Sequence, residues 1–263
     1  MNQFSKFNKI SKRITSFYTP THNLNKGQNE TTNKNAKCSV DGFKGFFVWK
    51  LDRLTSHFLK RKLKNKNFTI ISNNCIGGGI YHKFGLKFTS PTVGLFFFPD
   101  EYLLFIENLE YYVKQKMSFI KTSRHQGNNE YRNKTCRFYP IGLIDDKIEV
   151  HFMHYKTEQE ALKKWNRRCK RINFNNLFFT FTNDFDDKNG EYLQRYVNLS
   201  YEHKILFTSK HTSTEPEITV LMQDYKSNEF GDSARSRIYE KHLDLIKWLN
   251  GENNFLKENQ QCR

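Results

Sequence analysis

A thiol, two amides and three glycines follow one another in S-N-N-C-I-G-G-G, residues 72–79, directly after an apolar strand that begins at Phe68. A cysteine at a helix start can act as a nucleophile, because a helix N-terminus favours the thiolate. Three histidines could supply the base: His82, His151 and His154. The alternative is that Cys75 is a small packed side chain, since no cysteine-hydrolase motif surrounds it.

The side chains around Cys75 also suggest a binding role. Ser72, Asn73 and Asn74 are polar, and an amide can both donate and accept hydrogen bonds with sugar hydroxyls. Gly77 and Gly78 would let the backbone approach a ligand and present N–H groups to a phosphate. The pattern is neither G-x-G-x-x-G nor a P-loop, so it indicates no dinucleotide or P-loop nucleotide site. A tight turn with positive φ is the alternative explanation of the glycines.

Two later strands end in polar residues too: Asp184 and Asp186 follow Leu177–Thr182, and Ser209 and Lys210 follow Lys204–Thr208. Ligands of open α/β sheets gather beyond the carboxyl ends of the strands, so we expect these turns to share one crevice with residues 72–75. There Asp184 or Asp186 would hold a divalent ion, if one is used, against a diphosphate. Lys210 would offset the phosphate charge. A solvated acidic loop is the alternative for Asp184 and Asp186.

The segment H-F-M-H places His151 and His154 three residues apart. On a strand such residues point to opposite faces, so one ion could bind both rings only if the strand ended between them. We therefore interpret them as hydrogen-bonding histidines and predict no metal site. The sequence indicates no particular cofactor.

Strands and helices alternate through most of residues 67–250. Strands are predicted at Phe68–Ser72, Thr92–Phe98, Tyr139–Ile144, Lys147–Met153, Leu177–Thr182, Lys204–Thr208 and Ile218–Met222. Helices are predicted at Phe47–Leu63, Ile80–Phe84, Pro99–Val113, from Thr157 onward, Glu191–Val197 and Ser233–Leu249. The polar stretch Lys121–Arg137 is interpreted as a surface loop. This order predicts an α/β three-layer sandwich with a mostly parallel (mixed) sheet and one added β-hairpin.

Charge and composition divide the chain into three parts. We predict a disordered basic segment (1–45), a single α/β domain (46–251) and a polar C-terminal tail (252–263). Residues 1–66 hold 15 of the 43 basic residues but 3 of the 27 acidic ones, so they carry +12 of the net +16. This segment is either a solvated leader or a tether to an anionic membrane surface, worth about 1 kcal/mol per basic residue. No nucleic-acid-binding signature accompanies it, so we expect no nucleic acid partner.

Cysteine usage and hydropathy predict the compartment. Five widely spaced cysteines without a C-x-x-C pair are typical of a reducing environment. The chain has no secretory h-region and no apolar run near the ~20 residues that span a bilayer. We therefore predict a cytoplasmic protein, with peripheral membrane contact through the basic segment as an option.

Five stretches resemble a known family: Ile70–Tyr81, Ser90–Phe97, Tyr139–Asp145, a span from Glu149 through H-F-M-H-Y-K and Trp165 to Asn173, and Lys204–Lys210. They are similar to an uncharacterised bacterial family commonly labelled exopolysaccharide biosynthesis protein, or domain of unknown function 1919. That family often has Trp where Ile76 stands. The resemblance implies a cytoplasmic α/β protein that is made together with enzymes of capsule or other surface-polysaccharide synthesis. It identifies no catalytic residues.

Three functional hypotheses follow. The first is a transferase of surface polysaccharide biosynthesis that acts on a nucleotide-sugar or lipid-linked saccharide, with Asn73, Asn74 and the glycines at the donor. The second is acyl or other group transfer through Cys75. The third is a non-catalytic accessory protein that binds polysaccharide or a membrane-bound partner.

Overall fold

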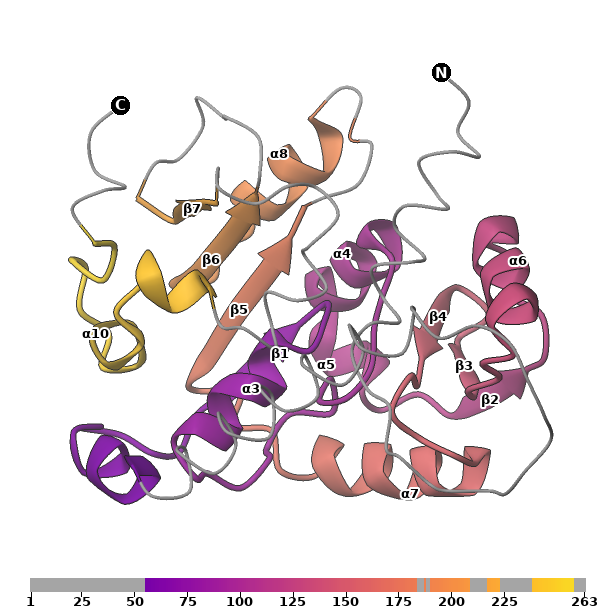
Figure 1. The fold of residues 1–263 in the computed structure, drawn as a ribbon, viewed down its shortest axis with the longest axis horizontal. Helices are drawn as coiled ribbons and strands as arrows, with labels where there is room; N and C mark the ends of the chain where they lie inside the picture. The colour runs from indigo at the N-terminus through magenta and orange to yellow at the C-terminus, as the bar shows by residue number, and fades with distance from the viewer. Residues whose placement is uncertain (1–54, 184–186, 188–189, 209–216, 223–237, 258–263) are drawn as a thin grey trace, which may run out of the picture.

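The computed structural model describes residues 55–183, 187, 190–208, 217–222 and 238–257, so the predicted segment 1–45 lies outside the described residues. Its main sheet has four parallel strands in the order β1-β5-β6-β7 (Figure 1). The strand bounds are Thr69–Ser72 (β1), Leu177–Thr182 (β5), His203–Thr208 (β6) and Thr219–Leu221 (β7). All four strands lie where the sequence predicted them.

Helices cover both faces of this sheet, because successive strand residues point to opposite sides. Ile70 belongs to a core with α3 and α10, whereas Ile71 belongs to a core with α4, α7 and α8. The helix bounds are Ile76–Lys83 (α3), Pro99–Glu107 (α4), Leu109–Tyr112 (α5), Gln126–Thr135 (α6), Glu158–Cys169 (α7), Glu191–Val197 (α8), Ile238–Lys241 (η1) and Leu245–Leu249 (α10). The α/β architecture with helices on both faces is confirmed.

The predicted hairpin is also present, but it belongs to a sheet of its own. β3 (Ile141–Ile144) and β4 (Ile148–His151) are antiparallel, and β2 (Met117–Ile120) pairs with β3 to complete three strands. Asp145 and Asp146 make the turn with φ of 52° each. The sequence analysis missed β2, because its four residues are too few to show a period.

The predicted strand Thr92–Phe98 is wrong. Residues 91–94 form a turn, Gly94 has a φ of 80°, and Phe96 makes only an isolated bridge with His151. The Ser90 hydroxyl accepts from the backbone N–H of Thr92, and such local bonds compete with a ladder. The apolar run is nevertheless buried: Phe97 donates its N–H to the Asn73 carbonyl, so this segment joins the two sheets.

The prediction of a surface loop at 121–137 is wrong as well, since α6 occupies most of it. The helix is polar overall, and its buried residues are Asn128, Tyr131 and Arg132. Arg132 donates to the carbonyls of Lys121 and Tyr139, which ties both ends of the segment to the domain. The sequence signal was absent because this helix is anchored by polar contacts and shows no apolar stripe.

The predicted terminal helices are each described in part. The first is helical over 55–61, and residues before 55 lie outside the described residues. The last is described from Ile238 and is broken, because the Asp244 carboxylate accepts from the N–H groups of Ile246 and Lys247 and begins a new helix there. Residues of the predicted polar tail return to this region, with Leu256 bridging Leu243.

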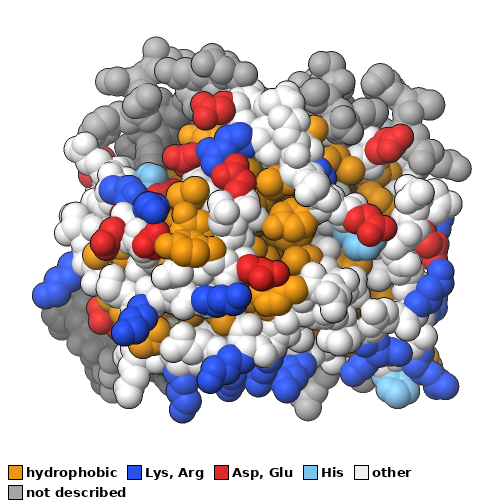
Figure 2. All heavy atoms as spheres, turned by 180° about the vertical axis from the view of Figure 1, so that it is seen from behind, with side chains coloured by type: hydrophobic (Ala, Val, Ile, Leu, Met, Phe, Trp, Pro, Cys, Tyr) orange, Lys and Arg blue, Asp and Glu red, His pale blue; other side chains and the backbone are white. Residues whose placement is uncertain are grey.

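The surface carries basic side chains beyond the N-terminal segment. Figure 2 shows Lys and Arg along the lower edge of one face, the edge at which α7 lies in Figure 1. Lys163, Arg167 and Lys170 are the exposed basic residues of this part of the chain. In the ranges that the structure describes, no helix is both long and apolar enough to cross a membrane.

Candidate functional site

The end of β1 is bound to the end of β5 by two asparagines. Asn73 Nδ2 donates to the Thr182 carbonyl at 3.1 Å, and Asn73 Oδ1 accepts from the Thr182 N–H at 3.1 Å. Asn74 Nδ2 donates to Thr182 Oγ1 at 2.8 Å, and its Oδ1 accepts from the Ile76 N–H at 3.0 Å. Asn73 is 1% exposed, so its amide supports the strand ends. Asn74 is half-buried.

The glycines lie inside α3, so the interpretation of a tight turn with positive φ is wrong for them. A Cβ on Gly77 would lie 2.7 Å from Ser72 Oγ, and one on Gly78 would lie 3.2 Å from Val93 Cγ1. Glycine therefore lets α3 pack directly against the end of β1. The first-turn N–H groups of a helix have no intrahelical acceptor, so Gly77 and Gly78 can still present them to a ligand.

Cys75 is the N-cap residue of α3, and its Sγ lies 3.2 Å from Nε2 of His154. Both side chains are half-buried. Of the three histidines that the sequence offered as a base, the structure therefore brings His154 to the thiol. A thiol beside an imidazole at a helix N-terminus is the arrangement that covalent cysteine catalysis uses.

The protonation of this pair has two opposing influences. Burial raises the pKa of the Cys75 thiol to about 12 from an ordinary value of 9.0. The imidazole at 3.2 Å offers the proton an acceptor at the moment of attack. The geometry therefore describes a thiol that is neutral at rest and is activated by general base catalysis, in contrast to a permanent thiolate.

The chain at His154 is held through contacts of the next residue, Tyr155. The chain turns after β4, and the Tyr155 hydroxyl donates to the Val93 carbonyl at 2.7 Å. Arg168 of α7, which is buried, donates to the same carbonyl at 2.8 Å and to the Tyr155 hydroxyl. Gly94 has a φ of 80°, which residues with a side chain rarely adopt, so the backbone of the facing turn requires glycine. The candidate base His154 is thus held beside the segment that joins the two sheets.

The two histidines of H-F-M-H lie in different surroundings, because β4 ends at His151 and the chain turns before His154. His154 approaches Cys75, whereas the fully buried His151 ring lies near Glu149 and Asn128. Burial lowers the pKa of His151, which favours its neutral form. The sequence analysis missed Glu149, although residues two apart on a strand share a face and this spacing could have indicated the pair.

The remaining predicted site residues, Asp184, Asp186, Ser209 and Lys210, lie outside the described residues. The described parts of those strand ends do meet: Asn183 donates its N–H to the Phe207 carbonyl at 3.0 Å. Asp187 accepts from the N–H groups of Tyr192 and Leu193 and so caps α8. The ends of β1, β5 and β6 therefore lie at one edge of the parallel sheet, and the predicted crevice beyond that edge stays a prediction.

A surface hollow of about 440 Å³ lies elsewhere, beside β2 and β3. Lys114, Lys116, Asp145 and Asp146 are among its lining residues, and none of the predicted site residues is. It is an open, solvated depression. The chemistry-bearing groups lie instead at the end of β1.

Comparison with known proteins gives a family. Residues 50–250 match the family described as Domain of unknown function (DUF1919). A protein of Haemophilus influenzae with the name "Uncharacterized protein" is 32% identical to this chain over 219 residues, which cover 81% of the chain and 96% of that relative. The chain therefore belongs to the DUF1919 family.

Proposed function

We propose that this protein is an acyltransferase that uses Cys75 as its nucleophile and a saccharide hydroxyl of a surface polysaccharide, or of its lipid-linked precursor, as acceptor. The observation that carries the proposal is the 3.2 Å contact between Cys75 Sγ and His154 Nε2 at the N-terminus of α3. The saccharide acceptor is an expectation from the resemblance to exopolysaccharide biosynthesis proteins.

The reaction has two balanced steps. In the first, His154 takes the thiol proton while Sγ of Cys75 attacks the carbonyl carbon of an ester or thioester donor. The N–H groups of Gly77 and Gly78 stabilise the oxyanion, and the leaving alcohol or thiol receives the proton from His154. In the second step His154 deprotonates the acceptor hydroxyl, whose oxygen attacks the thioester and releases Cys75 as a thiol.

The stretches that carry the family resemblance support this location. Ile70–Tyr81 supplies Cys75, Ser90–Phe97 supplies the turn with Gly94, and H-F-M-H-Y-K supplies His154. These three stretches are distant in sequence, and they meet through the contact of Cys75 with His154 and the hydrogen bond from Tyr155 to the Val93 carbonyl.

Transfer from a nucleotide-sugar is the second candidate, because the ends of the parallel strands β1, β5 and β6 lie at one edge of the sheet, and its proposed phosphate and metal residues follow β5 and β6 in the sequence. The two hypotheses differ in what they predict for Cys75. Glycosyl transfer needs no covalent intermediate on sulfur, whereas acyl transfer produces a thioester there.

Intact-protein mass spectrometry after incubation with acetyl-CoA, longer acyl-CoA thioesters and p-nitrophenyl acetate tests the proposal. The expected result is one acyl group on Cys75, removable by hydroxylamine, in the wild type and in Cys136→Ser. Cys136 is the matched control because it is an exposed cysteine outside the site. Cys75→Ser should lose the thioester, and His154→Gln should acylate about 10²-fold to 10⁴-fold more slowly, as expected for loss of a general base.

The absence of an acyl-enzyme across this panel, or equal acylation of Cys75→Ala, would refute the acyl transfer. Calorimetric titration with nucleotide-sugars, with and without Mn²⁺, then decides whether glycosyl transfer replaces it. The acceptor class is tested separately: a cell carrying Cys75→Ser should produce surface polysaccharide that has lost an acyl substituent but retains its sugar composition. Unchanged polymer would overturn the saccharide acceptor.

A further inference from the structure

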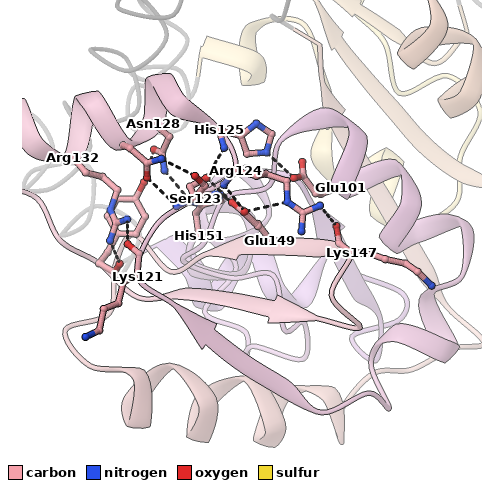
Figure 3. A network of polar contacts seen from close by, with 12 residues as sticks. Glu101, Lys121, Ser123, Arg124, His125, Asn128, Arg132, Lys147, Glu149 and His151 are labelled. Atoms are coloured by element: carbon pink, nitrogen blue, oxygen red, sulfur yellow. Dashed lines mark hydrogen bonds and ion pairs between the residues drawn. The ribbon is translucent and has the colours of Figure 1, made fainter.

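A second cluster of ionisable side chains lies away from Cys75, where α4, the start of α6 and β4 meet. It consists of Glu101, His125, Glu149 and His151 (Figure 3). One ligand atom from each of Glu101, His125 and Glu149 lies within 4.8 Å of those of the other two. His151 Nε2 is 3.5 Å from Glu149 Oε2. The proposed acyl transfer uses none of these groups.

One buried carboxylate oxygen of this cluster, Glu101 Oε2, has no hydrogen-bond partner among the described residues, and Glu101 is 5% exposed. A buried polar atom without a partner is unfavourable. Because Glu101 Oε2 is a Lewis base and the described residues bring it no proton donor, a bound cation would satisfy it.

Hydrogen bonds from neighbouring residues hold the side chains of the cluster, as the residues around a metal site hold its ligands. Asn128 Nδ2 lies 3.4 Å from Nδ1 of His151, and an amide nitrogen only donates, so the neutral ring carries its proton on Nε2, which faces Glu149 Oε2. The Ser123 hydroxyl donates to Glu149 Oε2, and the Arg124 N–H donates to Oε1 at 2.7 Å. Hydrogen bonds of this kind hold a ligating carboxylate in place.

The distances come close to those of a coordinated ion. Ligand atoms about 2.0–2.2 Å from a tetrahedral zinc lie roughly 3.3–3.6 Å from one another. The ligand atoms of Glu101, His125 and Glu149 lie within 4.8 Å of one another, so small side-chain movements would bring all three to one ion. His125 Nε2 and Glu101 Oε1 are 2.6 Å apart because they share a hydrogen bond, whose proton the ion would displace.

Charge favours a cation as well. Glu101 and Glu149 bring two carboxylates to the cluster, and Arg124 Nε, 3.1 Å from Glu149, brings one guanidinium. The two negative charges therefore exceed the one positive charge of Arg124, which suits a cation.

We propose that Glu101, His125 and Glu149 bind a divalent transition-metal ion, with zinc as the occupant that this nitrogen and oxygen ligand set suits, and that His151 holds the Glu149 carboxylate beside it. The two carboxylates are buried and take no part in the proposed acyl transfer, which favours a structural role for the ion. The ion would join α4, α6 and β4, and so would support the segment from His151 to His154. A bound water is the competing occupant.

The experiment uses the full chain without a histidine tag, stripped with a chelator and dialysed. Zinc chloride is titrated by calorimetry, and zinc content is measured by mass spectrometry of the metal. We expect a site of one zinc per chain whose affinity falls at least tenfold in His125→Gln and in Glu101→Gln. His57→Gln is the matched control, because His57 is exposed and distant in sequence from the cluster. Zinc should raise the thermal midpoint of the wild type and of the control, and not that of His125→Gln.

The proposal is overturned if the stripped wild type takes up no zinc, or if His125→Gln and Glu101→Gln bind zinc as tightly as the control. Either result would leave water as the occupant. Glu101→Gln keeps the size of the side chain and the hydrogen-bonding oxygen, so it serves as the test should His125→Gln fail to fold.

Discussion

Replacing Asn73 by Ala is expected to cost far more stability than replacing Asn74, although the two amides are neighbours. Asn73 satisfies both the N–H and the carbonyl of Thr182 in a site that is 1% exposed. Each buried group left unpaired costs about 1–3 kcal/mol, so Asn73→Ala should lower the free energy of unfolding by about 2–6 kcal/mol. Asn74 is half-buried and caps the start of α3, so its loss should cost about 1 kcal/mol.

Urea unfolding at neutral pH, followed by the fluorescence of the buried Trp165 and Trp248, measures both losses. Asn73→Asp adds a sharper test. It keeps the oxygen that accepts from the Thr182 N–H but puts a carboxylate oxygen opposite the Thr182 carbonyl. Burial and this repulsion raise the pKa of the new carboxyl group, so its penalty should shrink as the pH falls and the group protonates.

The reasoning about the strand ends would be refuted if Asn73→Ala lowered the free energy of unfolding by less than about 1 kcal/mol, or by no more than Asn74→Ala does. The two hydrogen bonds of Asn73 to Thr182 would then stabilise the protein no more than exposed hydrogen bonds do. If Asn73→Ala were stable and lost only saccharide binding, the result would support the ligand-binding role that the sequence suggested for Asn73.

Three further outcomes are expected. Gly142→Ala should destabilise the small sheet by about 1–3 kcal/mol in urea unfolding, because its Cβ would lie 2.6 Å from Met117 Sδ; an unchanged midpoint would contradict this packing. Thr157→Ala should cost about 1 kcal/mol by the same assay, since Thr157 accepts from the Glu160 N–H. Iodoacetamide labelling of Cys75, followed by peptide mass spectrometry, should rise about tenfold per pH unit from 7 to 10, because a pKa of about 12 leaves roughly 10⁻⁴ thiolate at pH 8. Rapid labelling at pH 6.5 would indicate a thiolate–imidazolium pair instead.

Local patterns in the sequence were sufficient for much of the fold. Leu177–Thr182 and Glu191–Val197 were predicted with the bounds that the structure has, because an apolar β-rich run and a short amphipathic segment carry their own periods. The helix predicted from Thr157 onward is likewise present, and Thr157 caps its first turn. Such features depend on neighbours within a few positions, and the sequence lists those neighbours directly.

Stretches whose conformation depends on distant partners were predicted poorly. Thr92–Phe98 looked like a strand because it is apolar, yet its burial comes from joining two sheets and not from a ladder. α6 looked like a loop because its anchor is Arg132, which binds carbonyls outside the helix. In both cases the composition correctly indicated whether the segment is apolar and buried or polar. Its backbone conformation was determined by contacts with residues distant in the sequence.

The same division applies to the Cys75 site. The sequence by itself determined that a thiol, amides and glycines follow a buried strand, and that three strand ends meet at one edge of a parallel sheet. Only the tertiary structure chose His154 among three histidines, placed the glycines inside a helix, and gathered Glu101, His125 and Glu149. Cys75 and His154 are 79 residues apart, and a contact over that separation is set by how the two sheets pack and not by any local period.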